Sequence, residues 1–290
     1  MKRPSLIIVV SLITVLAGTT MAQSTAQAAA QADTGFTSHA EFGGTSNADG
    51  QIYEINTSAG YNFNQHFGMD VGMPFYFVRA SSTVGGTSSN GVGNPYIQGR
   101  LRFLGPAVNF GSTLTGFAPL GDSRKGLSTG RATFDWNNHF DHSFSRLTPF
   151  AEVGIANTIA DSQLFFRPYT TLGFNTHFRA GAIYDLWKFL SVGASGYDIL
   201  PSGQQTVFSK VVHGPNPGAV SHGPVFQNNQ QTTGGADIAR DNGFSTWVDA
   251  KPSRYVDLEL GYTRSTHFQL NSVSFVIGFN LGQWYRKSGS

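Results

Sequence analysis

The segment near the end of the sequence alternates between apolar residues and small or polar residues. Its odd positions are all apolar over the stretch Val273-Ser274-Phe275-Val276-Ile277-Gly278-Phe279-Asn280-Leu281. Because successive side chains of a β-strand point to opposite faces, this stretch predicts a strand with one apolar face. The same period of two recurs along most of the chain, and helical periodicity is nearly absent. The sequence therefore predicts an all-β protein.

Alternation of this kind marks twelve candidate strands. They lie near residues 35–44, 51–62, 67–79, 94–104, 107–119, 129–140, 147–158, 168–185, 188–200, 243–250, 255–265 and 268–282. Many are about ten to twelve residues long, whereas strands of soluble proteins average about five or six. The longer value matches a tilted strand that crosses a bilayer. We expect a single antiparallel up-and-down transmembrane β-barrel of about twelve strands.

A soluble β-sandwich would also have one apolar face per strand, so the composition of the other face decides. Charged residues make up 12% of the chain, about half the usual share of a soluble domain. Glycine (35 residues) and phenylalanine (24 residues) are abundant instead. The polar positions of the strands hold mostly Gly, Ser, Thr, Asn and Tyr. This composition suits a crowded, partly wet lumen better than a surface open to water.

The N-terminus has the three parts of a secretory signal peptide. A basic start, Met1-Lys2-Arg3, precedes an apolar run over residues 6–18 and then small residues. Cleavage after Ala22 or after Ala30 fits, and the sequence does not choose between them. We expect a signal peptide over residues 1–30 and an outer-membrane barrel domain over residues 31–290. An uncleaved N-terminal anchor is the alternative.

The rest of the composition narrows the class further. No later segment has the roughly 18 consecutive apolar residues of a helical span, so any insertion into a membrane must use strands. The chain has no Cys, which excludes disulfides and a lipoprotein anchor. Without Lys2 and Arg3 the 19 basic residues fall to 17 and balance the 17 acidic ones, so charge gives no reason to expect a nucleic-acid partner.

Connections of alternating length provide a further test, since membrane barrels alternate tight periplasmic turns with longer external loops. The predicted turns are residues 64–66, 104–106, 141–146, 186–188 and 251–254. The predicted external connections are residues 45–50, 80–93, 120–128, 159–167 and 201–242, with a short one near Thr266. Aromatic residues cluster by the turns, as an interfacial girdle would: Phe63, Phe67, Phe140, Phe144, Trp187 and Phe189, with Trp284 and Tyr285 after the last strand.

In these features the chain resembles the bacterial outer-membrane β-barrel superfamily. The pattern Phe275-x-Ile277-x-Phe279-x-Leu281 looks like the terminal signal that such proteins present to the barrel-insertion machinery, although residues 283–290 continue beyond it. Among subfamilies, the stretches 139–144 and 149–154 look most like porin-like barrels grouped with MetA-pathway phenol degradation. The resemblance implies a location in the cell outer membrane, with membrane lipid and the insertion machinery as partners.

If the apolar faces meet lipid, the opposite faces line the lumen. The candidate lumen-lining residues are Glu41, Glu54, Asp70, Arg100, Arg102, Asp135, Glu152, His177, Arg179, Asp257 and Glu259. Arg100 and Arg102 share one face, and Asp135, Glu152, Asp257 and Glu259 are candidate partners for them. These charges would either form a constriction that orients polar solutes or pair to fill a narrow interior. Both interpretations remain open from the sequence.

Catalytic and metal sites receive little support. The serine and histidine residues near the expected external rim are Ser265 with His267, and His213 and His222 in the long loop, and none has a recognisable base-orienting partner. The pattern His139-x-Asp141-His142 is better explained as solvated polar residues at a turn than as metal ligands. We therefore expect no catalytic residue, metal or cofactor.

The function that the sequence favours is passive or weakly selective passage of small solutes across the outer membrane. The first alternative is a non-conducting structural or adhesive barrel, since twelve strands lie between filled and open barrels. A hydrolase at the outer-membrane rim is a third and weaker alternative. The apolar islands in the loop over residues 201–242 favour a partly ordered lid, with a merely flexible segment as the alternative. The loop could also bind a partner or continue its flanking strands as a hairpin.

Overall fold

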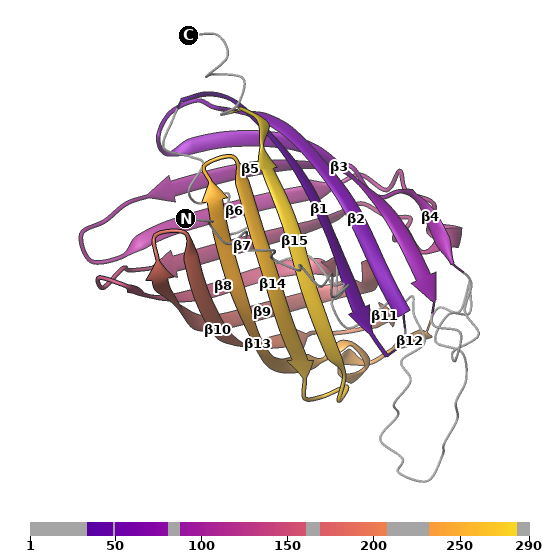
Figure 1. The fold of residues 1–290 in the computed structure, drawn as a ribbon. Coiled ribbons are helices and arrows are strands. Elements are labelled where there is room, and N and C mark those ends of the chain that lie inside the picture. Colours follow the sequence, from indigo (N-terminus) through magenta and orange to yellow (C-terminus); the bar gives the residue numbers. More distant parts are fainter. Residues whose placement is uncertain (1–33, 49, 81–87, 161–168, 208–231, 283–290) are drawn as a thin grey trace, which may run out of the picture.

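Strands that alternate in this way pair with their sequence neighbours to form one closed sheet. The computed structural model describes residues 34–48, 50–80, 88–160, 169–207 and 232–282. Twelve strands form the wall (Figure 1): β1 (Gly35–Asn47), β2 (Gly50–Asn62), β3 (Phe67–Ala80), β5 (Tyr96–Phe103), β6 (Asn109–Phe117), β7 (Thr133–Asp141), β8 (Leu147–Ala160), β9 (Tyr169–Trp187), β10 (Leu190–Pro201), β13 (Asp241–Ser253), β14 (Val256–Ser265) and β15 (Asn271–Asn280).

Every pairing in this wall is antiparallel, and the sheet closes on itself. β1 pairs with β15, where His39 lies opposite Asn280, and β10 joins β9 to β13. The order of strands around the ring follows the order in the sequence. The result is the predicted up-and-down barrel of twelve strands, and closure leaves the wall without an unpaired edge.

All twelve predicted segments correspond to strands, with boundaries that differ by up to four residues. The largest difference is at β7, which begins at Thr133 rather than near residue 129. Residues 118–132 leave the sheet because they form a compact connection of their own. It contains the short 3₁₀ turn η1 (Ser123–Lys125), and Gly126 and Gly130 there have positive φ.

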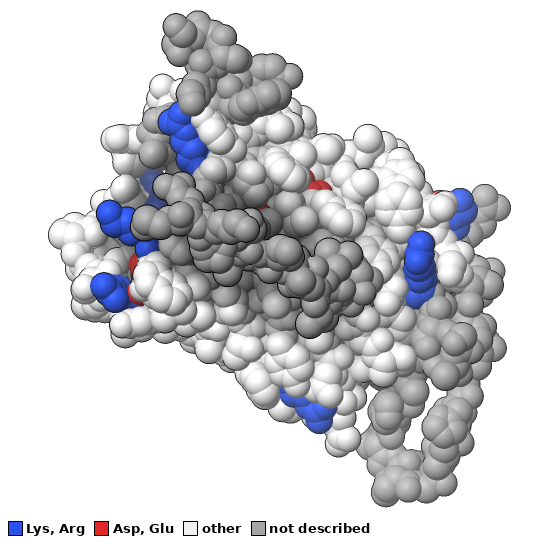
Figure 2. Space-filling view, in the orientation of Figure 1, with Lys and Arg blue, Asp and Glu red and all other residues white. Residues whose placement is uncertain are grey.

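Alternation along each strand separates an outer apolar face from an inner polar one. On β14, Leu260 is 49% exposed while its neighbour Glu259 is 7% exposed. The outer set includes Phe36, Ile55, Val71, Met73, Ile97, Leu114, Trp136, Phe178 and Phe244, all exposed. On the face shown in Figure 2, Lys and Arg side chains lie toward the two ends of the barrel, and little charge appears on the broad middle. A lipid-facing band has this distribution.

The two ends of the barrel differ in their connections. One end, here called the turn end, has the short connections 63–66, 104–108, 142–146, 188–189 and 254–255. β1 starts and β15 finishes at this end. Exposed aromatic side chains cluster here, and rings stack between Phe63 and Phe67 and between Trp187 and Phe189, as expected for an interfacial girdle. Trp284 and Tyr285 lie outside the described residues, as do the signal-peptide segment and both cleavage positions.

The opposite end, here called the loop end, has most of the long connections. The connection predicted over residues 45–50 is nearly absent, because β1 and β2 continue to Asn47 and from Gly50. Three short strands lie beside the wall at this end in Figure 1: β4 (Ser89–Val92), which pairs with β3, and β11 (Gln205–Val207) and β12 (Thr232–Gly234). β11 pairs with both β9 and β12. The flanks of the 201–242 loop thus extend the sheet as a hairpin, and its centre lies outside the described residues.

Among the described residues, no helix is long and apolar enough to cross a membrane.

Candidate functional site

The inner face of the barrel is the candidate site. The alternation of residues along each strand determines which of the predicted side chains face the lumen. All eleven candidates occupy inward-facing positions: Glu41 on β1, Glu54 on β2, Asp70 on β3, Arg100 and Arg102 on β5, Asp135 on β7, Glu152 on β8, His177 and Arg179 on β9, and Asp257 and Glu259 on β14. His139 on β7 and Asp249 on β13 share this face. The inner wall therefore combines charged side chains with Gly, Ser, Thr and Asn.

One buried cluster ties β1, β2, β3 and β5 together near the turn end. The Nε atom of Arg100 donates to the carboxylate of Asp70 at 2.5 Å, and a terminal nitrogen of Arg100 donates to Asn62 at 3.1 Å. The hydroxyl of Thr37 donates to the other carboxylate oxygen of Asp70 at 3.0 Å. A buried ion pair costs desolvation energy, and these additional hydrogen bonds offset part of that cost.

This arrangement gives Arg100 a partner that the sequence did not single out. We expected Asp135, Glu152, Asp257 or Glu259 to pair with the two arginines of β5. Asp70 lies on the neighbouring strand, where Gly68 is opposite Arg100, so the guanidinium reaches it directly. Arg102 interacts electrostatically with Asp141 on β7, again close by in the ring. Short cross-strand distances decide the pairing here.

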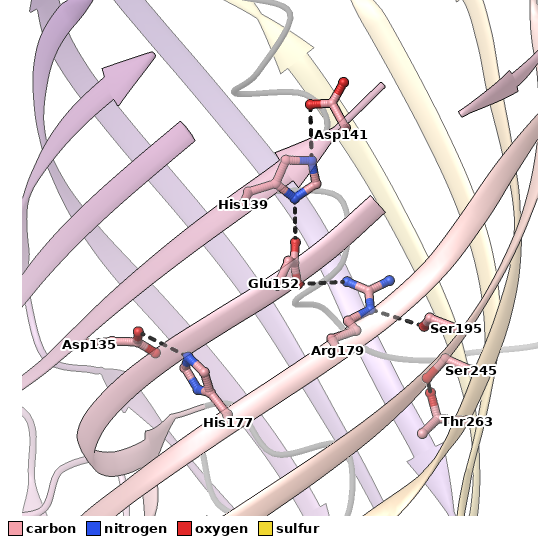
Figure 3. A network of polar contacts seen from close by, with 9 residues as sticks. All are labelled: Asp135, His139, Asp141, Glu152, His177, Arg179, Ser195, Ser245 and Thr263. Carbon is pink, nitrogen blue, oxygen red and sulfur yellow. Dashed lines mark hydrogen bonds and ion pairs between the residues drawn. The ribbon is translucent and has the colours of Figure 1, made fainter. Parts of the chain in front are cut away.

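A second cluster forms a chain of charged side chains across β7, β8 and β9 (Figure 3). Arg179 lies 3.5 Å from one carboxylate oxygen of Glu152 and donates to the hydroxyl of Ser195 on β10 at 3.0 Å. The other oxygen of Glu152 lies 3.0 Å from Nδ1 of His139, whose Nε2 lies 3.3 Å from Asp141. Beside this chain, His177 approaches Asp135 at 3.7 Å. Two of the predicted residues, Glu152 and Arg179, thus form one chain with His139, Asp141 and Ser195, and the predicted His177 and Asp135 form a separate pair beside it.

Aromatic rings that the sequence pattern does not single out complete this cluster. The guanidinium carbon of Arg179 lies 5.0 Å from the ring centres of both Phe150 on β8 and Trp247 on β13. Both rings are buried and occupy inward positions. An added Cβ on Gly193 would overlap the indole of Trp247, so this glycine lets the ring lie flat against β10. The sequence does contain a signal for these rings, because Phe150 and Trp247 are aromatic residues on the face of β8 and β13 that otherwise holds mostly small or polar residues.

The wall from β13 to β2 is predominantly acidic. Asp249 lies directly opposite Glu259, and Asp257 and Glu41 both lie opposite Gly278 of the intervening strand β15. Glu54 lies one strand further along, opposite Gly43. We call Glu41, Glu54, Asp249, Asp257 and Glu259 the acidic wall. Its basic neighbours are Lys251, whose Nζ lies 3.3 Å from Asp249 and 3.9 Å from Asp257, and Arg179, which interacts electrostatically with Glu259.

Apolar side chains are buried toward the loop end of the barrel. Ile52 on β2 and Val78 on β3 lie opposite each other in the register, occupy inward positions and are 3% exposed. Leu127 of the β6–β7 connection is fully buried and lies against Gly91 of β4. An inner wall in contact with bulk water would leave these side chains exposed, so the connections at this end cover part of the inner face.

Of the residues considered for catalysis, Ser265 and His267 are described, and their contacts are not those of a nucleophile and its base. Ser265 is fully buried, donates to Asp241 at 2.5 Å and accepts from the backbone N–H of Phe268. Tyr197 donates to the same carboxylate at 2.9 Å. His267 packs edge-on against the ring of Phe268. His213 and His222 lie outside the described residues. Within the described ranges, no group of three or more His, Asp and Glu side chains is arranged to hold a metal ion.

Comparison with known proteins finds similarity among solved structures only. No family model matches the sequence, and no curated protein matches it. Among solved structures, an outer membrane channel from Pseudomonas putida F1 is similar with a TM-score of 0.58 and 12% identity, over 86% of this chain and 96% of that one. The KdgM porin has a TM-score of 0.48 and 7% identity, over 83% of this chain and 98% of that one. The NanC porin has values of 0.49 and 6%, with the same coverage.

At these identities the likeness concerns the fold alone. The described chain has the closed antiparallel fold of outer-membrane barrels, as the resemblance to that superfamily predicted. The fold and the apolar outer band together point to the cell outer membrane. The finer resemblance to phenol-degradation barrels stays a prediction, since no family model matches.

Proposed function

We propose that this protein is an outer-membrane channel that lets small polar solutes pass through the barrel, passively or with weak selectivity. The observation that carries the proposal is the inner face, where charged and hydroxyl side chains replace the apolar residues that would fill a solid core. A polar, charged wall inside a closed barrel offers a solute groups that replace its hydration. The similar fold of the Pseudomonas channel is consistent with this role.

The chain's own residues would act in two ways in such a channel. The clusters around Arg100 and Arg179 tie neighbouring strands together and keep the wall rigid, because their hydrogen bonds and ion pairs cross strands. The half-exposed charges, such as Asp257, would meet the passing solute. We further propose that the turn end faces the periplasm and the loop end the exterior, as in other exported barrels.

A non-conducting structural barrel is the second candidate. The observation that favours it is the burial of Ile52, Val78 and Leu127, which indicates that the loop end is partly covered. A barrel closed at one end would stabilise the membrane or present its loops without passing solutes. This candidate and the channel differ in one measurable property, which is conductance.

The test is single-channel recording of the refolded chain, without residues 1–30, in a planar bilayer, after circular dichroism has established β structure. Steady conductance steps would support the channel. A folded barrel that inserts but stays silent at all voltages would favour the structural role and would contradict the channel. Insertion can be established independently by the protection of the strands from added protease in proteoliposomes.

A further inference from the structure

Most of the described acidic residues of this barrel lie on the inner face, whereas most of the described basic residues do not. The described residues include 14 Asp and Glu and 13 Lys and Arg. Eleven of the acidic residues occupy inward positions: Glu41, Glu54, Asp70, Asp135, Asp141, Glu152, Asp185, Asp241, Asp249, Asp257 and Glu259. Only four of the basic ones do: Arg100, Arg102, Arg179 and Lys251. With histidines neutral, the inner face has an excess of seven formal negative charges, although the two signs nearly balance over the described chain.

The basic side chains of the lumen are also less accessible to water than several of the acidic ones. The side chains of Arg100 and Arg179 are 5% and 12% exposed, and both make ion pairs within the wall. The side chains of Asp135 and Asp257 are 34% and 31% exposed. Lys251 is more exposed, at 42%, and lies between two carboxylates, and Arg102 is partly exposed as well. A solute inside the barrel would therefore meet mainly negative charge.

The acidic wall concentrates this charge on one side. Asp249 and Glu259 are direct cross-strand neighbours, a placement of like charges that destabilises a sheet. Asp257 and Glu41 flank Gly278, and a Cβ added there would be 3.6 Å from Cβ of Asp257, so no side chain separates the two acids. Lys251 and Arg179 offset part of this repulsion, since Lys251 contacts Asp249 and Asp257 and Arg179 interacts electrostatically with Glu259. The acidic wall nevertheless places five carboxylates beside these two basic groups.

We propose that the channel is selective for cations and that the acidic wall is the surface along which inorganic cations and small cationic solutes pass. This inference rests on the proposed channel function and names its solute class. Fixed negative charges between low-dielectric walls raise the local concentration of cations and lower that of anions. Rings or arcs of Asp and Glu produce cation selectivity by the same electrostatics.

The first test is the reversal potential of the open channel under a KCl gradient at pH 8. We expect K⁺ to be more permeable than Cl⁻ by about threefold or more. A reversal potential at zero, or one of the sign for anions, would overturn the inference while leaving the channel function intact. A silent barrel would instead overturn the channel function, and the inference with it.

A matched pair of variants assigns the selectivity to the acidic wall. In the triple variant Glu41→Gln, Asp257→Asn, Glu259→Gln, the permeability ratio should fall toward one. The control neutralises three carboxylates outside the inner face of the strands, with Asp122→Asn, Asp198→Asn and Asp237→Asn, and should keep the ratio of the unmodified protein. An unchanged ratio in the wall variant would refute the assignment.

The wall variant changes one residue that is almost buried, so folding needs a safeguard. Asp257→Asn alone changes a half-exposed carboxylate and should lower the ratio part of the way. If this single variant folds, conducts and keeps the full ratio, the acidic wall does not set the selectivity. The reversal potential of the unmodified protein decides the inference even if no variant folds.

Discussion

The guanidinium carbon of Arg179 lies 5.0 Å from the ring centre of Trp247, and the same distance separates it from the ring centre of Phe150. The arginine is thus held between two aromatic rings from strands on either side of its own. The ring centres of Phe150 and Trp247 are 6.1 Å apart. Because Arg179 also contacts Glu152 and Ser195, the cluster joins four consecutive strands of the ring, β8, β9, β10 and β13. We regard it as a structural brace of the inner wall.

Replacing Trp247 by Ala should therefore destabilise the barrel. The change removes a buried aromatic side chain and one of the two rings beside Arg179, so we expect a loss of about 3 kcal/mol in the free energy of unfolding. Trp247→Phe keeps a ring at the site and should lose less than half as much. Urea unfolding in lipid vesicles, followed by the gel mobility of folded and unfolded forms, measures both. Equal losses in the two variants would argue against a role for the ring.

Gly193 should be intolerant of a side chain for the same reason. A Cβ at this position would overlap the indole of Trp247, so Gly193→Ala forces the ring away from β10 and should cost about 1–3 kcal/mol. Gly99 on β5 is the matched control, because an added Cβ there meets no atom within 4 Å. Gly99→Ala should change the unfolding midpoint little. If both variants unfold alike, the close approach of Trp247 to Gly193 is not a constraint.

Much of the architecture could be predicted because the alternation of apolar and polar residues along the sequence determines which side chains face outward and which face inward. In a sheet exposed to lipid on one face, every second residue must be apolar, and Phe275, Ile277 and Phe279 satisfy this rule without help from distant residues. Strand count and inward or outward orientation follow from such local patterns. The short connections follow as well, because neighbouring antiparallel strands need only a tight turn.

Side-chain partners could not be predicted in the same way, because they depend on stagger between strands. Alternation shows that Arg100 faces inward, but only the register, with Gly68 opposite, brings Asp70 within hydrogen-bond distance. Phe150 and Trp247 could not be identified from the alternation, because a single apolar residue on the polar face of a strand does not form a pattern. The burial of Leu127 depends on how the β6–β7 connection folds against β4. An irregular connection has no repeating pattern from which its fold could be predicted.

A charged substitution in the outer apolar band should lower the free energy of unfolding most near the middle of the band. Met73 lies well inside β3 and is 49% exposed on the outer face, so Met73→Arg would place a guanidinium in the hydrocarbon and should cost about 2–4 kcal/mol. Leu104 lies in the turn after β5, and Leu104→Arg should cost about 0–1 kcal/mol, since the guanidinium group of the new side chain reaches the membrane interface. Unfolding from vesicles measures the difference. Similar costs at both positions would mean that the apolar band does not contact hydrocarbon.

The ion pair between Arg100 and Asp70 should show strong coupling in a double-mutant cycle. Both side chains are almost fully buried, so Arg100→Met leaves the Asp70 carboxylate without its charged partner and should cost about 3–5 kcal/mol. Asp70→Asn should also be costly, because the guanidinium then keeps its desolvation penalty. The double variant removes both charges, and we expect its loss to be smaller than the sum of the single losses by about 1–3 kcal/mol.

The same unfolding measurement on all four proteins gives this coupling energy. Thr37→Val is a useful companion variant, since it removes only the hydroxyl that donates to Asp70 and should cost about 1 kcal/mol. Additive losses from Arg100→Met and Asp70→Asn would mean that the two charges do not stabilise each other. Because this cluster ties β1 and β2 to β3 and β5 beside the acidic wall, its loss should also increase the noise of the open-channel current.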